Sequence, residues 1–285
     1  MIKLLYKEKN VSSFQKIKSF AKNNNIKKIG HTGTLDPIAE GLLLIATEDD
    51  TKLIPYIDTK YKSYIATMQL GISSTTWDVD GILTKNNLIY HLNELKILKA
   101  FEKFNGFYDQ KPPIFSAKKI NGQRAYKLAR ENKEITLKKQ KVEIKNLKLL
   151  NFNFENQTIE FSVTVSRGTY IRSLIQDIAK ELNVIATMSK LLRYEINDLT
   201  LSDLEKTELN PLELIKEKKH FLNLQDLKIL IKGQNVKIDE NINENHIFLV
   251  YKKNIVGLAI IKNGYLKSKK LFGKKIERIL KDEKI

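Results

Sequence analysis

The stretch 30–44 constrains this chain most, because its first eight residues suit neither a regular helix nor a regular strand. Those eight residues, 30–37, read G-H-T-G-T-L-D-P. Glycine is conformationally loose, and proline lacks an N–H group and fixes its own φ angle. The pattern therefore predicts a rigid, shaped loop. Asp36 precedes Pro37, which favours an extended backbone at Asp36, and the apolar run 41–46 predicts a buried segment that anchors the loop from behind.

Asp36 has two interpretations on the residues alone. Asp-Pro and Thr-Gly pairs are common in surface turns, and an aspartate in such a turn needs no function. The octapeptide, however, resembles G-H-T-G-x-L-D-P, the signature of the TruB-type tRNA pseudouridine synthases. In that family the aspartate of the motif is the catalytic residue. The resemblance implies that Asp36 is catalytic and that His31 supports the RNA substrate.

The charge of the chain points to a polyanionic partner. Its 50 Lys and Arg residues exceed its 33 Asp and Glu residues and give a formal net charge of +17. Basic side chains bind phosphates and release counterions, which favours a nucleic acid. A membrane surface, solubility or a compositional bias towards lysine would produce the same excess. The chain has no cysteine, which excludes disulfides and thiol nucleophiles. Its four histidines lie at no metal-ligand spacing, so we expect no metal.

The start of the chain and its apolar runs bear on localisation. The first eight residues are too short and too charged for a signal peptide. Nothing approaches the apolar length that a membrane crossing requires. We therefore expect a cytoplasmic protein without a membrane partner. A chain of 285 residues is long enough for one large domain or for a large domain with a small one.

Two segments of the middle region resemble further motifs of the same family. Residues 62–64 read K-S-Y, like the K-x-Y motif whose tyrosine stacks on the target base, and Tyr64 begins a strand pattern that runs to Leu70. An ordinary strand tyrosine is the alternative for Tyr64. Residues 74–81 resemble T-x-T-x-D-x-x-G, with Ser74 in place of the first threonine. The resemblance implies that Asp78 contacts the flipped base or its supporting loop.

Residues 110–130 form the longest match to the family. They agree with Q-x-P-P-x-x-S-A-x-K-x-x-G-x-R-x-Y-x-x-A-R at every fixed position. The two adjacent prolines exclude a regular helix or a central strand there. Cations beside a tyrosine suit an RNA backbone with an unstacked base, and a solvated helix face is the alternative. The resemblance implies substrate contacts by Lys119, Arg124, Tyr126 and Arg130.

The segment 166–172 lies between a strand pattern over 159–165 and a helical pattern over 171–182. Functional side chains are often held where loops leave rigid elements. The segment resembles the family motif G-T-Y-I-R, which implies that Tyr170 lies in the active site and that Arg172 pairs with Asp36. A structural salt bridge would make the same contact. Downstream, Leu191 and Arg193 match the family's L-R-R, whereas Leu192 replaces an arginine that would contact phosphate.

The N-terminal segment and the C-terminal region resemble the family less closely. Where the family has Asp-Lys-Pro-x-Gly, residues 6–10 read Y-K-E-K-N. Ser12 and Gln15 then have the spacing of a capping box, which predicts a helix over 13–23. Near the C-terminus, apolar alternations at 227–231, 236–238, 247–251 and 256–260 predict short strands. Their placement is similar to that of the PUA domain of bacterial TruB proteins.

The resemblance spans about residues 12–193 and implies an α+β fold. The expected architecture is a pseudouridine synthase core with a mixed central sheet, residues 1–210, followed by a small PUA-like β-barrel that binds RNA, residues 211–285. Residues 97–104 predict a further helix of the core. We expect a monomer with no obligate protein partner.

The implied reaction converts the T-arm uridine of tRNA to pseudouridine. It involves no redox change and no net addition of atoms, so no cofactor is expected. The resemblance implies that Asp36 acts as nucleophile or base, that Arg172 keeps it ionised and that Tyr64 stacks on the uracil. Tyr170 would transfer a proton and Leu191 would exclude water. The alternatives are a tRNA-binding folding chaperone with secondary or no catalysis, a guide-RNA-dependent synthase and a basic structural protein.

Overall fold

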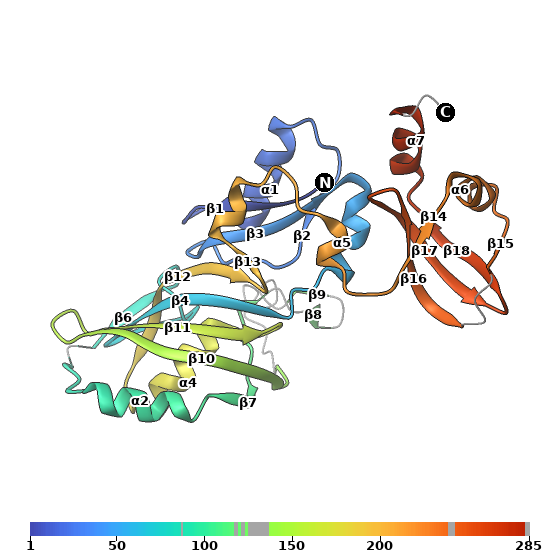
Figure 1. The fold of residues 1–285 in the computed structure, drawn as a ribbon. Coiled ribbons are helices and arrows are strands. Elements are labelled where there is room, and N and C mark those ends of the chain that lie inside the picture. The colour runs from blue at the N-terminus through green and yellow to red at the C-terminus, as the bar shows by residue number, and fades with distance from the viewer. Residues whose placement is uncertain (87, 117–118, 121–122, 125–136, 239–242, 283–285) are drawn as a thin grey trace.

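The computed structural model describes residues 1–86, 88–116, 119–120, 123–124, 137–238 and 243–282. A nine-stranded sheet forms the larger part of it (Figure 1). The strands follow the order β1-β3-β12-β4-β11-β10-β7, with β13 beside β12 and β2 beside β3. They are β1 (Ile2–Lys7), β2 (Ile29–His31), β3 (Glu40–Thr47), β4 (Tyr61–Leu70), β7 (Gly106–Gln110), β10 (Gln140–Asn153), β11 (Thr158–Ser166), β12 (Ala186–Ile196) and β13 (Leu199–Thr200). The pairing of β12 with β3 is parallel and the others are antiparallel, so the predicted mixed central sheet is confirmed.

The helices cover the sheet as their apolar periodicity predicts. Helix α1 (Ser13–Asn23) begins with the predicted capping box, in which the Gln15 backbone N–H donates to Ser12 Oγ. Helices α2 (Glu94–Glu102) and α4 (Ile171–Glu181) lie together on one side of the sheet (Figure 1). The buried positions of β11 alternate strictly, as the sequence pattern requires. Their apolar side chains form one core with those of both helices.

The parallel contact between β12 and β3 brings the loop before β3 against the centre of the sheet. Arg193 is the register partner of Gly41. Gly41 has a φ of 110°, and a Cβ atom there would lie 2.2 Å from the Arg193 carbonyl oxygen. Only a glycine fits a backbone with this conformation and this neighbour. The contact therefore fixes how the chain enters β3, and with it the position of the preceding loop.

A second sheet follows in the C-terminal part of the chain. Its order is β14-β16-β17-β18-β15, an open path of five strands in the described residues. The strands are β14 (Lys219–Leu222), β15 (Val236–Lys237), β16 (Glu244–Tyr251), β17 (Asn254–Lys262) and β18 (Tyr265–Leu271), and the helices α6 (Leu224–Ile231) and α7 (Gly273–Asp282) accompany them. Three of the four predicted strand segments are confirmed. A closed barrel stays a prediction, as does the boundary at residue 210.

The predicted strand at 227–231 is wrong, because these residues belong to α6. The Asn223 side chain accepts a hydrogen bond from the Asp226 backbone N–H at 2.8 Å and caps the helix. Leu227 and Leu230, three residues apart, are the buried pair. A short apolar run fits both the period of a strand and the period of a helix, so the local pattern could not decide between the two structures.

The two sheets share a hydrophobic cluster. Leu42 and Leu44 of β3 belong to the same cluster as Phe248 and Val250 of β16. The remaining short elements of the described chain are η1 (Glu48–Tyr56), β5 (Ile72–Ser74), β6 (Leu83–Lys85), β8 (Lys119–Ile120), β9 (Gln123–Arg124), η2 (Leu201–Glu205) and α5 (Pro211–Leu214). Among the described helices, none combines the length and the apolar character that a membrane crossing needs.

Replacing Gly41 with alanine tests the contact between β3 and β12. Backbone strain at positive φ amounts to about 1–3 kcal/mol. The steric overlap with Arg193 adds to it, so we expect Gly41→Ala to lower the free energy of unfolding by more than about 4 kcal/mol. Urea unfolding measures this loss. Gly106→Ala is the matched control, because Gly106 has a φ of 103° but a Cβ atom added there would meet nothing within 4 Å. Equal losses in both variants would contradict the steric account.

Candidate active site

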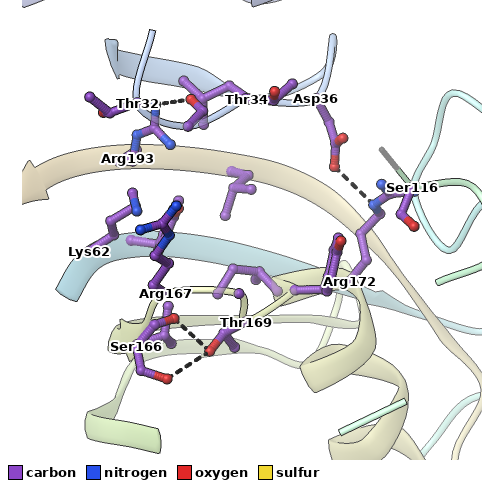
Figure 2. A pocket seen from close by; sticks show the side chains of 18 residues that line it. Thr32, Thr34, Asp36, Lys62, Ser116, Ser166, Arg167, Thr169, Arg172 and Arg193 are labelled. Atoms are coloured by element: carbon purple, nitrogen blue, oxygen red, sulfur yellow. Dashed lines mark hydrogen bonds and ion pairs between the residues drawn. The ribbon is translucent and has the colours of Figure 1, made fainter. Parts of the chain in front are cut away.

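A cavity of about 320 Å³ opens where the 32–36 loop, strands β4 and β12 and the β11–α4 junction meet (Figure 2). Six residues predicted from the sequence line it: Asp36, Tyr64, Tyr170, Arg172, Leu191 and Arg193. They come from four separate segments of the chain. Tyr64 and Leu191 are each 8% exposed, so their side chains form the packed wall of the cavity.

The loop that carries Asp36 is held by hydrogen bonds along its length. Ser13 Oγ donates to the Leu35 carbonyl and accepts from the Leu35 N–H, both at 2.9 Å. Arg193 Nη2 donates to the Gly33 carbonyl at 3.1 Å, and its Nε donates to the Leu42 carbonyl at 2.7 Å. Arg193 is 1% exposed, so its guanidinium is largely committed to the backbone of the loop and of β3. The loop is thus held by Ser13 of α1 and by Arg193 of β12.

The N-terminal segment that departs from the family pattern also supports this loop. Lys7 is fully buried, and its amine donates to the carbonyls of Glu8, Val11 and Pro37. Asn10 has a φ of 65°, and its N–H donates to the Pro37 carbonyl at 2.8 Å. Asparagine tolerates this left-handed backbone better than most residues. Asn10 can therefore occupy the place of the family's glycine without changing the path of the chain.

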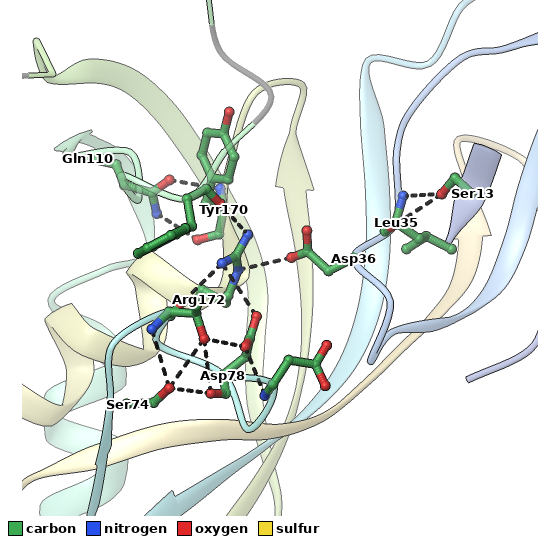
Figure 3. A network of polar contacts seen from close by, with 11 residues as sticks. Ser13, Leu35, Asp36, Ser74, Asp78, Gln110, Tyr170 and Arg172 are labelled. Atoms are coloured by element: carbon green, nitrogen blue, oxygen red, sulfur yellow. Dashed lines mark hydrogen bonds and ion pairs between the residues drawn. The ribbon is translucent and has the colours of Figure 1, made fainter. Parts of the chain in front are cut away.

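Arg172 is the centre of the polar network behind Asp36 (Figure 3). Its Nε lies 2.9 Å from Asp36 Oδ2, and its Nη1 lies 3.4 Å from Asp78 Oδ2. Nη1 and Nη2 also donate to the carbonyls of Thr76 and Phe115 at 2.9 and 3.0 Å. The side chain is 5% exposed. The predicted contact between Arg172 and Asp36 is therefore present in the structure, within a larger network that fixes the guanidinium.

Asp78 is fixed by the turn in which it lies. Thr76 Oγ1 donates to Asp78 Oδ1 at 2.6 Å, and the Asp80 N–H donates to the same oxygen at 3.1 Å. Trp77 has a φ of 65°, an uncommon conformation for an aromatic residue, and its carbonyl accepts from the Met188 N–H. Asp78 is 3% exposed and lies behind Arg172, outside the lining of the cavity. This geometry suits a residue that orients Arg172.

The pKa of Asp36 is raised above its ordinary value. Burial is the main cause, because it disfavours the charged carboxylate. The Arg172 guanidinium opposes this effect, whereas the Asp78 and Asp80 carboxylates add to it. Asp36 is therefore a carboxylate whose charge Arg172 stabilises only in part, since that arginine also faces Asp78.

Tyr170 is positioned through its backbone at the start of α4. Its N–H donates to Gln110 Oε1 at 2.8 Å, and Gln110 Nε2 donates to its carbonyl at 3.1 Å. Gln110 is fully buried at the end of β7. This double hydrogen bond ties the strand before the two prolines to the strand–helix junction. It explains why a glutamine precedes the proline pair by two residues.

The remaining predicted residues are not brought into the cavity by the described structure. His31 ends β2 and does not line the cavity. Lys119 and Arg124 are register partners of the β8–β9 pair, and their side chains are not described. Tyr126 and Arg130 lie outside the described residues. The substrate contacts predicted for these residues stay predictions.

The cavity lining also includes Lys62, Ser116 and Arg167, which are absent from the set that the sequence predicts. Ser116 is 5% exposed, and its hydroxyl has no hydrogen-bond partner within the described chain. Lys62 and Arg167 both lie in or beside motifs whose tyrosines carry the predicted roles. The sequence signal that could have found these two cations is their position shortly before a motif tyrosine, Lys62 before Tyr64 and Arg167 before Tyr170. No group of three or more His, Asp or Glu side chains in the described residues could hold a metal ion.

A solved structure shows the fold, and a family model identifies the class. The chain superposes on a chain of a Cbf5–Nop10–Gar1 complex with a TM-score of 0.63 and 22% identity, over 95% of this chain and 84% of that chain. At this identity the likeness concerns the fold. Residues 21–171 match the model of the TruB family pseudouridylate synthases, N-terminal domain. The fold and the site thus define a pseudouridylate synthase.

Similarity to curated proteins identifies the family. The chain is 44% identical to the tRNA pseudouridine synthase B of Mycoplasma mobile, over 99% of this chain and 98% of that protein. It is 45% identical to the protein of the same name from Mycoplasmopsis pulmonis, over 100% of this chain and 99% of that one. The chain belongs to the TruB family.

Replacing Asp78 with asparagine tests the electrostatic account of Asp36. The change removes a neighbouring negative charge and leaves Arg172 with one carboxylate, so we expect the pKa of Asp36 to fall. Carboxyl-carbon NMR titration measures it. Asp80→Asn is the graded control: it should lower the pKa of Asp36 by less, because Asp80 makes a smaller contribution than Asp78. An unchanged pKa in Asp78→Asn would contradict the account.

Proposed function

We infer that this chain isomerises uridine to pseudouridine in tRNA, and we propose the T-arm uridine as its target. The observation that carries the inference is the pairing of Asp36 with the buried Arg172 in a cavity that two tyrosines line. The activity follows from membership of the TruB family. The specific residues and the target position are proposals.

The reaction requires three physical tasks of the protein. The C1′–N1 bond of the nucleotide breaks, the uracil turns, a C1′–C5 bond forms, and the hydrogen on C5 is replaced by one on N1. The product has the same atoms as the substrate. First, the base must leave the stack so that C1′ can be reached. Second, a carboxylate must attack or deprotonate the nucleoside. Third, a proton must leave C5.

The cavity supplies one group for each task. Asp36 acts as nucleophile or base on the sugar, and Arg172 keeps its carboxylate aimed and ionised. Tyr64 stacks on the uracil after it leaves the RNA. Tyr170 transfers a proton at C5 or at the sugar. Leu191 excludes water, which would otherwise compete for C1′ once the glycosidic bond is broken. Asp78 acts on the reaction through Arg172.

The RNA extends beyond the cavity over basic surfaces. We propose that residues 119–130, with Lys119, Arg124, Tyr126 and Arg130, contact the RNA near the target base, together with His31. We also propose that residues 1–210 form the catalytic domain and residues 211–285 a PUA-like RNA-binding domain. Exposed lysines on β17 and β18 support this, including Lys262, Lys267 and Lys270. The working unit is a monomer in the cytoplasm, without a cofactor or an obligate protein partner.

An unmodified tRNA transcript tests the activity and its central residue. Purified wild-type protein should form pseudouridine at the T-arm uridine without added guide RNA, metal or cofactor. Asp36→Asn should lower the single-turnover rate by at least about 10³-fold, because it removes the group that reacts with the nucleoside. Sequencing at single-nucleotide resolution measures the product.

Asp198→Asn is the matched control for this experiment. Asp198 is an exposed carboxylate at the β12–β13 turn, outside the cavity, and its loss should leave the rate unchanged. If wild type binds the transcript but forms no pseudouridine, the chain is an RNA-binding protein and the catalytic roles fail. If product forms only with an added guide RNA, the proposal of a stand-alone synthase fails.

A further inference from the structure

The cavity has two ends of different charge (Figure 2). Asp36 and Arg172 form one end, where the carboxylate is shared between an arginine and the solvent. Lys62, Arg167 and Arg193 gather at the other end. For these three side chains, the described residues provide no carboxylate within salt-bridge distance. Like charges brought together in a partly buried place repel one another. Such a cluster therefore needs an explanation.

Lys62 is a buried cation with a single hydrogen bond to the protein in the described residues. Its side chain comes from β4, two residues before Tyr64, and is 9% exposed. Its amine donates to the Thr59 carbonyl at 3.3 Å. Burial, and then the positive charges of Arg193 and Arg167, lower the pKa of Lys62 to about 8. A lysine held in this way destabilises the free protein, since a neutral side chain of the same length would fill the same space without the buried charge.

Arg167 joins the cavity to the outer surface. Its backbone N–H donates to the Lys60 carbonyl at 2.8 Å, which fixes the loop between β11 and α4. Its side chain is exposed, and it lines both the cavity and a neighbouring hollow beside η1. That hollow is of mixed charge, since Lys60, Lys216, Asp58 and Glu217 also line it. Arg193 contributes positive charge, although its Nε and Nη2 already donate to the backbone of β3 and of the Asp36 loop. Lys62 and Arg167 are thus the cations with the larger share of their donors left for a ligand.

We propose that Lys62 and Arg167 bind a backbone phosphate next to the target uridine while Asp36 acts on its sugar. This rests on the proposed function and adds a binding subsite to it. A nucleotide carries its phosphate on the same sugar that bears the glycosidic bond, so a base and sugar at the Asp36 end place an anion towards the cationic end. The phosphate supplies the missing counterion. It thereby turns the repulsion among the cations into substrate binding.

Unfolding measurements on Lys62→Met separate this proposal from a structural role. The variant replaces the lysine with an unbranched, uncharged side chain that is one atom shorter. We expect its thermal unfolding midpoint to rise by about 2–4 °C, because a buried charge without a partner is removed. A lower midpoint would mean that Lys62 stabilises the fold, and would overturn the proposal. Lys99→Met is the control: Lys99 is an exposed lysine of α2 outside the cavity, and its loss should change neither the midpoint nor the activity.

A substrate with one neutral linkage identifies the phosphate. T-arm hairpins carry a single methylphosphonate on the 5′ or the 3′ side of the target uridine. We expect one of these linkages to slow wild type about 10- to 100-fold, as for the loss of a charged hydrogen bond. Lys62→Met should show a similar loss on unmodified RNA and no further loss on that same linkage. On the other linkage the two losses should multiply.

Two results would overturn the proposal. One is a wild-type enzyme that neither linkage slows. The other is a set of losses that multiply for both linkages, which would mean that Lys62 and the phosphates act independently. Inactivity of wild type on unmodified RNA would instead contradict the proposed function. In that case the dissociation constants of wild type and Lys62→Met for the unmodified and the methylphosphonate RNAs are measured instead of rates. A loss of affinity that does not multiply for one linkage would still show that Lys62 binds that phosphate.

Discussion

The position of Arg172 is the constraint on which the site depends. Its guanidinium contacts Asp36, Asp78 and the carbonyls of Thr76 and Phe115, which belong to three segments far apart in the chain. An arginine buried at the first turn of a helix has little freedom, and its planar group can hold several acceptors at fixed angles. One side chain thus aligns the loop before β3, the turn after β5 and the segment after β7.

Sharing Arg172 between two carboxylates has a chemical consequence. A carboxylate with an arginine of its own would be strongly stabilised in the charged form and would react weakly. Asp78 takes part of the available positive charge and adds its own repulsion, and burial acts in the same direction. The charge on Asp36 is therefore kept at a higher free energy than in a simple ion pair. Fixed neighbours make this possible, because Asp78 and Arg172 are both buried and cannot turn away.

Local pattern predicts the elements with a strong period, and the resemblance predicts the site. The helix at 13–23 and the strand at 159–165 are confirmed because capping and alternation act within a few residues. The strand predicted at 227–231 is wrong because five apolar-rich residues fit two periods. The roles of Lys7 and Lys62 could not be predicted from spacing, since they depend on segments that only the β1–β3 and β4–β12 pairings, respectively, bring together.

The distribution of charge in the cavity follows the polarity of a nucleotide. The end at which we propose the sugar binds holds a carboxylate, and the opposite end holds cations without carboxylate partners in the described chain. A site shaped for stability alone would pair these charges within the protein, because buried charges without partners raise the free energy of the folded state. Without acidic partners in the described chain, Lys62 and Arg167 keep their N–H donors available for an incoming anion. The same separation keeps Lys62 from pairing with Asp36, so that in the proposed reaction binding and chemistry use different charges of one small cavity.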